Sequence, residues 1–131
     1  MYLRFVHSTA VKGMRAREGF FQAAYALKKH PQTDKFTHDH ISSLIEWIEY
    51  NLDAPPRFNR TKSRNHSRLH TAGLSWFKSS ATEHLEKAHE LATLLVQHGY
   101  GIEVLKTLRP GYIIYEDEVQ IVAEPFADTP V

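Results

Sequence analysis

The stretch from Tyr112 to Phe126, YIIYEDEVQIVAEPF, decides the fold that we expect for this chain. Alternate residues of an extended strand share one face. A strand from Tyr112 to Ala123 therefore places Glu116, Glu118 and Gln120 together on one face. The opposite face then carries the apolar residues Ile113, Tyr115, Val119, Ile121 and Ala123. The three polar groups are the best candidate for a functional site.

Two features on either side of this strand suggest turns. Pro110 and Gly111 suit the centre of a tight turn that leads into it. Asp117 falls on the apolar face and is a poor strand former. A bulge or tight turn at Glu116–Glu118 is therefore compatible with the pattern. The tail after Pro125 is expected to be frayed.

The segment before this strand reads as a strand, a helix and a second strand. Ser80 and Glu83 form a capping-box pattern, which predicts that a helix begins there. Gly99 is a natural stop for that helix. The flanking strands are expected at Gly73–Lys78 and Ile102–Leu108.

The first half of the chain predicts one strand and two helices. Tyr2–Ser8 is rich in aromatic and β-branched residues, which favours a strand. Glu18–Lys29 repeats apolar residues at helical spacing, and Pro31 ends this helix. Thr37 is the expected N-cap of the second helix. The apolar stripe of the second helix comprises Ile41, Leu44, Ile45, Ile48 and Leu52.

This order of elements predicts an α+β fold, in which a small mixed or antiparallel sheet is covered by about three helices. The 131 residues correspond to a single domain, 1–131. The chain has no cysteine, which excludes disulfides, thiolate metal sites and a cysteine nucleophile. It also has no apolar run near the roughly 20 residues of a membrane helix. The N-terminus lacks a signal-peptide pattern, so we expect a cytoplasmic protein.

The net charge of +1 hides a segregation of charge along the chain. No acid lies between Asp53 and Glu83, and no base follows Arg109. The segment 57–72 is expected to be a mobile basic loop, since it is long, polar and poor in apolar residues. Such a loop suits a polyanion, because its charges attract phosphates and its hydroxyls and amides position them. The expected ligand-binding residues are Arg57, Arg60, Arg64, Arg68, Lys78 and Gln120.

The acidic residues of the last strand allow a second interpretation. Glu116 and Glu118 could supply acid–base chemistry or hold a ribose hydroxyl. A solvated strand face, or pairing of these acids with the basic loop, is the interpretation that we favour. The nine histidines show no metal-binding spacing, so no metal is expected.

Several blocks of the chain resemble short uncharacterised bacterial or phage proteins. These blocks include Gly19–Tyr25, Trp76–Lys78 and the stretch from Pro110 to Phe126. The resemblance covers most of the chain. It implies a bacterial or phage origin and carries no assigned activity.

The arrangement also resembles a minimal ADP-ribosyltransferase core. The matching positions are Arg4 or His7 on the first strand, Trp76-Phe77 with the serines that follow, and Glu116-Asp117-Glu118. The resemblance implies NAD as cofactor, with Glu118 as the catalytic carboxylate and Arg4 and Glu116 beside it. The Ser-Thr-Ser triplet of that family is absent.

Two functions therefore follow from the sequence, and whether the protein is an enzyme is left open. The first is a small intracellular interaction or regulatory domain, without a cofactor, that binds nucleic acid or an acidic protein surface. The second is an NAD-using transferase. A purely structural assembly, with Trp47 or Tyr100 at a subunit contact, is a third interpretation.

Overall fold

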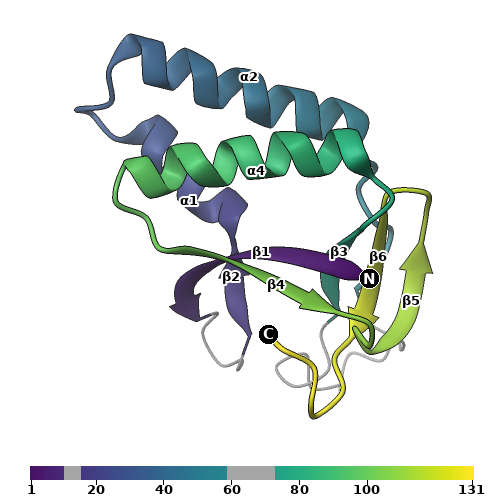
Figure 1. Cartoon of the computed structure of the whole chain (residues 1–131). Helices are drawn as coiled ribbons and strands as arrows, with labels where there is room; N and C mark the ends of the chain where they lie inside the picture. The colour runs from purple at the N-terminus through teal and green to yellow at the C-terminus, as the bar shows by residue number, and fades with distance from the viewer. Residues whose placement is uncertain (11–15, 59–72) are drawn as a thin grey trace.

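The computed structural model describes residues 1–10, 16–58 and 73–131. Within these ranges, three helices lie over one face of a six-stranded antiparallel sheet (Figure 1), which confirms the α+β prediction. The strands are β1 (Tyr2–Ala10), β2 (Arg17–Gly19), β3 (Leu74–Lys78), β4 (Ile102–Thr107), β5 (Tyr112–Glu116) and β6 (Gln120–Glu124). The helices are α1 (Phe20–Lys29), α2 (Lys35–Asn51) and α4 (Thr82–Gln97).

The sheet has the strand order β2-β1-β3-β6-β5, and β4 pairs with β1. Every pairing between the described strands is antiparallel. The short strand β2 was not predicted, because its three residues lie in a stretch that reads as a loop followed by a helix. The helix predicted from Glu18 begins at Phe20 for the same reason, since Glu18 belongs to β2.

The pairing of β1 is interrupted on one edge. β4 pairs with β1 along most of its length and occupies the other edge. On the interrupted edge, β3 pairs with β1 up to Leu3, and β2 pairs with it from Val6 onward. Arg4 and Phe5 lie between these two pairings. At this interval no described strand pairs with that edge of β1.

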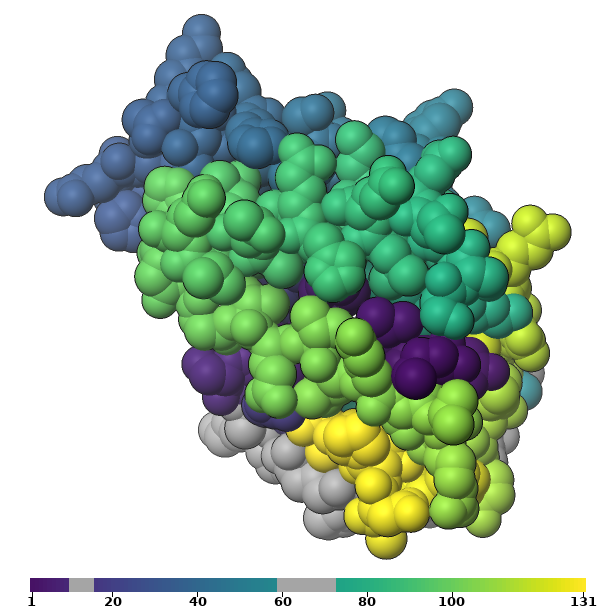
Figure 2. All heavy atoms as spheres, in the orientation of Figure 1, coloured from purple at the N-terminus to yellow at the C-terminus, as the bar shows by residue number. Residues whose placement is uncertain are grey.

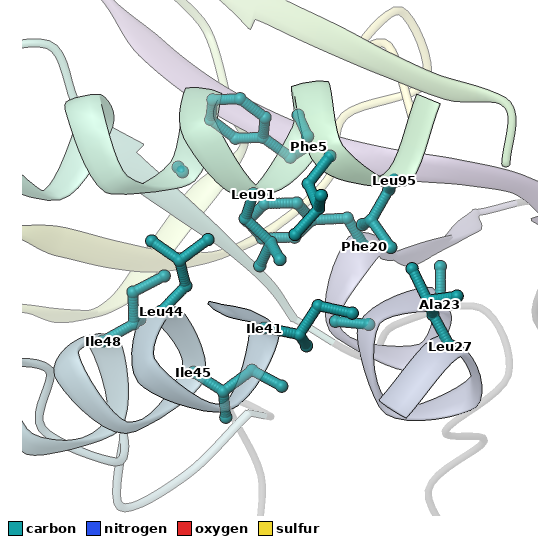
Figure 3. Packing of buried hydrophobic residues seen from close by; sticks show 14 of the residues in the cluster. Phe5, Phe20, Ala23, Leu27, Ile41, Leu44, Ile45, Ile48, Leu91 and Leu95 are labelled. Carbon is teal, nitrogen blue, oxygen red and sulfur yellow. The ribbon is translucent and has the colours of Figure 1, made fainter. Parts of the chain in front are cut away.

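The main core lies between the helices and the sheet (Figure 3). Phe5 of β1 and Phe20 of α1 pack there against the predicted apolar stripe of α2. Alternation along the strands separates this core from a smaller one on the opposite face, which contains Val6 and Trp76. The helix-side core is made of residues that are at most 8% exposed, among them Ala23, Leu27, Ile41, Leu44, Ile45, Ile48, Leu91 and Leu95.

Two predicted helix caps were wrong. The second helix begins one turn earlier than expected, and Asp34 is its N-cap: its carboxylate accepts a hydrogen bond of 2.8 Å from the Thr37 amide. The helix α4 begins at Thr82 behind Ala81, without a side-chain cap, so Ser80 does not form the expected capping box. Gly99 follows α4 with a φ of +90°, as a helix-ending glycine should.

The stretch from Tyr112 to Phe126 forms two strands and not one. β5 ends at Glu116 and β6 begins at Gln120, so Glu118 lies in the turn between them. The Asp117 carboxylate holds this turn by accepting hydrogen bonds from the Val119 and Gln120 amides at 2.8 and 2.9 Å. Glu116, Glu118 and Gln120 therefore do not share one strand face, and the turn that the sequence allowed is the correct alternative.

The C-terminal tail is packed, contrary to the prediction that it is frayed. Thr129 is buried, and its hydroxyl donates a 3.0 Å hydrogen bond to the Arg109 carbonyl oxygen. The Val131 carbonyl oxygen accepts one from the Arg17 side chain. Figure 2 shows the C-terminal segment, in yellow, on the side of the molecule away from α2 and α4.

In the described ranges, no helix is both long and apolar enough to cross a membrane. Gly111 has a φ of +131° between β4 and β5, and a side chain there would overlap the Glu124 carbonyl. Pro110 and Gly111 lie in the connection between β4 and β5, but no turn is assigned to them, β4 pairs with β1 and β5 pairs with β6, so the predicted tight turn was wrong. Most of the predicted basic loop, 59–72, lies outside the described residues.

Candidate functional site

A pocket of about 590 Å³ lies where the interrupted edge of β1 faces β3. Helix α1 and the end of α2 cover it from the helix side. Its walls come from segments that are far apart in sequence, so the fold creates this pocket and no single motif does. The lining residues are Arg4, Phe5, Gly19, Phe20, Phe21, Tyr25, Ile48, Glu49, Leu52, Asp53, Ala54, Pro55, Ser75, Trp76, Phe77 and Gln120.

Aromatic side chains form much of the wall. Phe5 stacks on Phe20 with ring centroids 5.0 Å apart and meets Phe77 edge to face at 6.1 Å. Strand alternation places Phe5 and Phe77 on the helix side of the sheet, while Phe20 reaches them from the first turn of α1. These three rings are buried, and Phe5 packs against the other two. They therefore form a rigid wall of flat aromatic surfaces.

The charged residue of the interval, Arg4, is buried at 7% exposure. Its Nη2 donates a 2.5 Å hydrogen bond to the Arg17 carbonyl oxygen. Its Nη1 is buried without a hydrogen-bond partner, and among the described residues no carboxylate forms an ion pair with it. Burial, with a smaller contribution from the positive charge of Arg17, lowers the pKa of Arg4 to about 10. Arg4 therefore remains charged at neutral pH, and no carboxylate of the described residues balances that charge.

The N-terminus of α1 also borders the pocket through Gly19, Phe20 and Phe21. Gly19 provides no side-chain cap, and the first turn of α1 contains no acidic residue. The first amides of a helix have no intrahelical partner, and the helix dipole makes this end positive. The helix end and the Arg4 guanidinium therefore favour negative charge in the pocket.

Polar contacts at the helix-covered side hold the lining together. The Tyr25 hydroxyl donates a hydrogen bond to the Glu49 carboxylate, which joins α1 to α2 and raises the pKa of Tyr25. Gln120 is buried, and its side-chain amide donates a 2.6 Å hydrogen bond to the Asp53 carbonyl oxygen. This bond fixes the segment after α2 against β6.

The site residues predicted from the sequence lie in several different parts of the structure. Arg4 and Gln120 line the pocket. Lys78 and Glu116 form an ion pair of 2.5 Å and are not among the lining residues. Glu118 is exposed in the β5–β6 turn.

The basic residues predicted to bind a polyanion are described only in part. Arg57 is exposed at the end of the described range 16–58. Arg60, Arg64 and Arg68 lie outside the residues that the structure describes. Within the described ranges, no three histidine, aspartate or glutamate side chains gather as a metal ion would require.

The aromatic wall was not predicted from the sequence. Phe5, Phe20 and Phe77 look like ordinary core residues in the sequence, because apolar residues at strand or helix spacing carry no sign of a cavity. The available signal was an arginine between two apolar residues of a buried strand, Leu3-Arg4-Phe5. A charged residue is seldom fully buried unless it is paired or functional.

The chain matches no protein-family model, no curated protein and no solved structure at a significant level. The likenesses to short bacterial proteins and to ADP-ribosyltransferases therefore stay predictions.

Proposed function

We propose that the protein binds a small, flat organic anion in the pocket between β1, β3 and the helices. The observation that carries the proposal is Arg4, a lining residue of the aromatic pocket whose buried guanidinium has no ion-pair partner among the described residues. A buried charge without a partner costs several kcal/mol. A ligand that brings the missing negative charge removes that cost on binding.

The charges around the pocket determine the orientation in which the ligand binds. Arg4 and the start of α1 make one side positive, whereas the acids Glu49 and Asp53 are exposed on the α2 side. By strand alternation the Arg4 side chain leaves β1 on the face opposite Phe5, and its guanidinium is closed off from solvent. It therefore acts on the ligand only through its electric field, which the low-dielectric interior screens weakly. The anionic group of the ligand therefore lies toward β1 and α1.

The size and chemistry of the walls define the rest of the ligand. About 590 Å³ is within the range of pockets that enclose small organic molecules. Rigid rings such as Phe5 and Phe77 pack best against a flat, apolar body. An aromatic carboxylate or an aromatic phosphate fits this description.

The proposal is tested with naphthoate and its neutral analogue naphthamide. A fragment of about a dozen heavy atoms binds a well-formed pocket with a Kd near 1 mM, at roughly −0.3 kcal/mol per atom. Titrations followed by amide proton–nitrogen NMR spectra measure affinities in this range. Naphthoate is expected to shift the amides of Phe5, Gly19 and Ser75, and to bind about tenfold more tightly than naphthamide, which corresponds to about 1.4 kcal/mol.

Arg4→Met is expected to remove this preference, so that the two compounds bind within about twofold of each other. Arg109→Met is the matched control, because Arg109 is exposed and lies outside the pocket. The control should keep the preference of the wild type. Equal affinity for the two compounds in the wild type, or no shift of the pocket amides by either, would contradict the proposal.

The two functions expected from the sequence remain separate proposals. NAD combines flat rings with negative charge and so belongs to the same ligand class. The carboxylate that the ADP-ribosyltransferase resemblance assigns to catalysis, Glu118, does not line the pocket. Of the residues predicted to bind nucleic acid or an acidic protein, Gln120 lines the pocket, Arg57 and Lys78 do not, and Arg60, Arg64 and Arg68 lie outside the described ranges.

A further inference from the structure

The backbone of β3 directs hydrogen-bonding groups toward the interrupted edge of β1. The Ser79 amide donates to the Met1 carbonyl oxygen at 3.1 Å, whereas the Lys78 amide donates to Val119 on the β6 side at 2.7 Å. Backbone groups of successive strand residues point to opposite edges. The N–H and C=O of Ser75 therefore face β1.

The same reasoning applies to β1. The Ser8 amide donates to the Gly101 carbonyl oxygen at 3.1 Å, on the side of β4. Residues an odd number of positions away, such as Phe5, therefore direct their backbone groups to the other edge. In a continuous ladder the Phe5 N–H would donate to the Ser75 C=O, but the pairing of the two strands ends at Leu3 and Phe77.

Both residues of this missing rung line the pocket. Ser75 is exposed although its neighbours Leu74 and Trp76 are buried, as expected for a residue that faces a cavity. Phe5 is only 2% exposed, so its amide lies where water has little access. Backbone groups in such a place are nearly always hydrogen-bonded in folded proteins.

We propose that the ligand supplies the missing rung of the sheet. It would present an acceptor to the Phe5 N–H and, next to it, a donor to the Ser75 C=O. An adjacent acceptor and donor are the edge of an amide, which a carboxamide, a lactam or a nucleobase carries. This inference rests on the proposed function and narrows the ligand to flat anions with an amide-like edge.

Three naphthoates that differ in one substituent test the inference. Carbamoyl-naphthoate offers both acceptor and donor, acetyl-naphthoate keeps the acceptor alone, and ethyl-naphthoate has neither. Each lost hydrogen bond is expected to weaken binding roughly fivefold. The measurement is the same NMR titration, on the wild-type protein.

Hydrogen exchange of single amides provides the second readout. In the free protein the Phe5 amide should exchange faster than the Leu3 amide, which lies within the paired part of β1. Carbamoyl-naphthoate and acetyl-naphthoate should slow the exchange of Phe5, and ethyl-naphthoate should not.

The outcomes separate the two proposals. All three compounds could shift the pocket amides with equal affinity and equal effect on the Phe5 exchange. This result would contradict the proposal that the ligand has an amide-like edge, and it would still support an anion-binding pocket. If none of them shifts these amides, the proposed function itself is wrong. Graded affinities together with protection of Phe5 would support both.

Discussion

At the scale of single residues, Arg4 combines two properties that seldom occur together: it is buried, and no carboxylate of the described residues balances its positive charge. Such a residue lowers the free energy of unfolding, because no interaction with a carboxylate offsets the desolvation of its charge. Arg4 would then act like many functional residues, which destabilise the protein that carries them.

Replacement of Arg4 by methionine is therefore expected to raise the free energy of unfolding by about 1 kcal/mol or more. The methionine side chain fills similar space without a charge, and Arg109→Met on the surface should change stability by less than about 0.5 kcal/mol. Urea unfolding at neutral pH measures both. A clear loss of stability in Arg4→Met would show instead that Arg4 has a structural role through its bond to the Arg17 carbonyl.

At the scale of elements, the turn between β5 and β6 depends on one carboxylate. Burial raises the pKa of Asp117, but hydrogen bonds from the Val119 and Gln120 amides, the Gln120 side chain and the Tyr115 hydroxyl outweigh this effect. The net result is a pKa below the usual range. The ionised form of Asp117 therefore stabilises the folded state.

This coupling predicts how stability depends on pH. The stabilisation by Asp117 is fully present above the pKa of the unfolded chain, about 3.9. It is lost as the pH falls through the lower pKa of the folded protein. The stability advantage of the wild type over Asp117→Asn, which keeps an acceptor but does not titrate, should shrink as the pH falls below about 4. Denaturant unfolding at pH values between neutral and about 2 checks this, and an advantage that stays constant would contradict it.

The sequence predicted those helices and strands that depend on a local pattern of apolar residues. The apolar stripe of α2 was correct, because Ile41, Leu44 and Ile48 are spaced to share one helix face. The strand from Tyr112 to Ala123 was wrong as a single element, because hydrogen bonds to Asp117 close a turn that alternation of apolar residues does not reveal.

The pocket could not be predicted from any local sequence pattern. It arises where the partner of β1 along one edge changes from β3 to β2, and these two strands lie far apart in the chain. A strand pattern indicates which residues alternate but not which strands pair. The resemblance to ADP-ribosyltransferases singled out Arg4, whereas Phe5 and Ser75 carried no signal of their own.

At the scale of the whole molecule, the opposite charges of the middle and last segments meet at one described contact, the Lys78–Glu116 ion pair. A separate proposal is that the basic residues bind a polyanion. Arg60→Ala combined with Arg64→Ala is expected to weaken binding to a DNA duplex and to flatten its salt dependence. Lys106→Ala is the control, since Lys106 is exposed on β4, outside the basic segment. Binding that is unchanged in the double variant would remove this proposal.

The central claim is that the pocket between β1, β3 and the helices holds a flat anion. A crystal structure of the protein soaked with an iodinated naphthoate tests it most directly, because the anomalous signal of iodine locates the ring. We predict the ring against Phe5 and Phe77, with the carboxylate toward Arg4 and the first turn of α1. An iodine peak elsewhere on the molecule, or a carboxylate turned toward Glu49 and Asp53, would contradict the account.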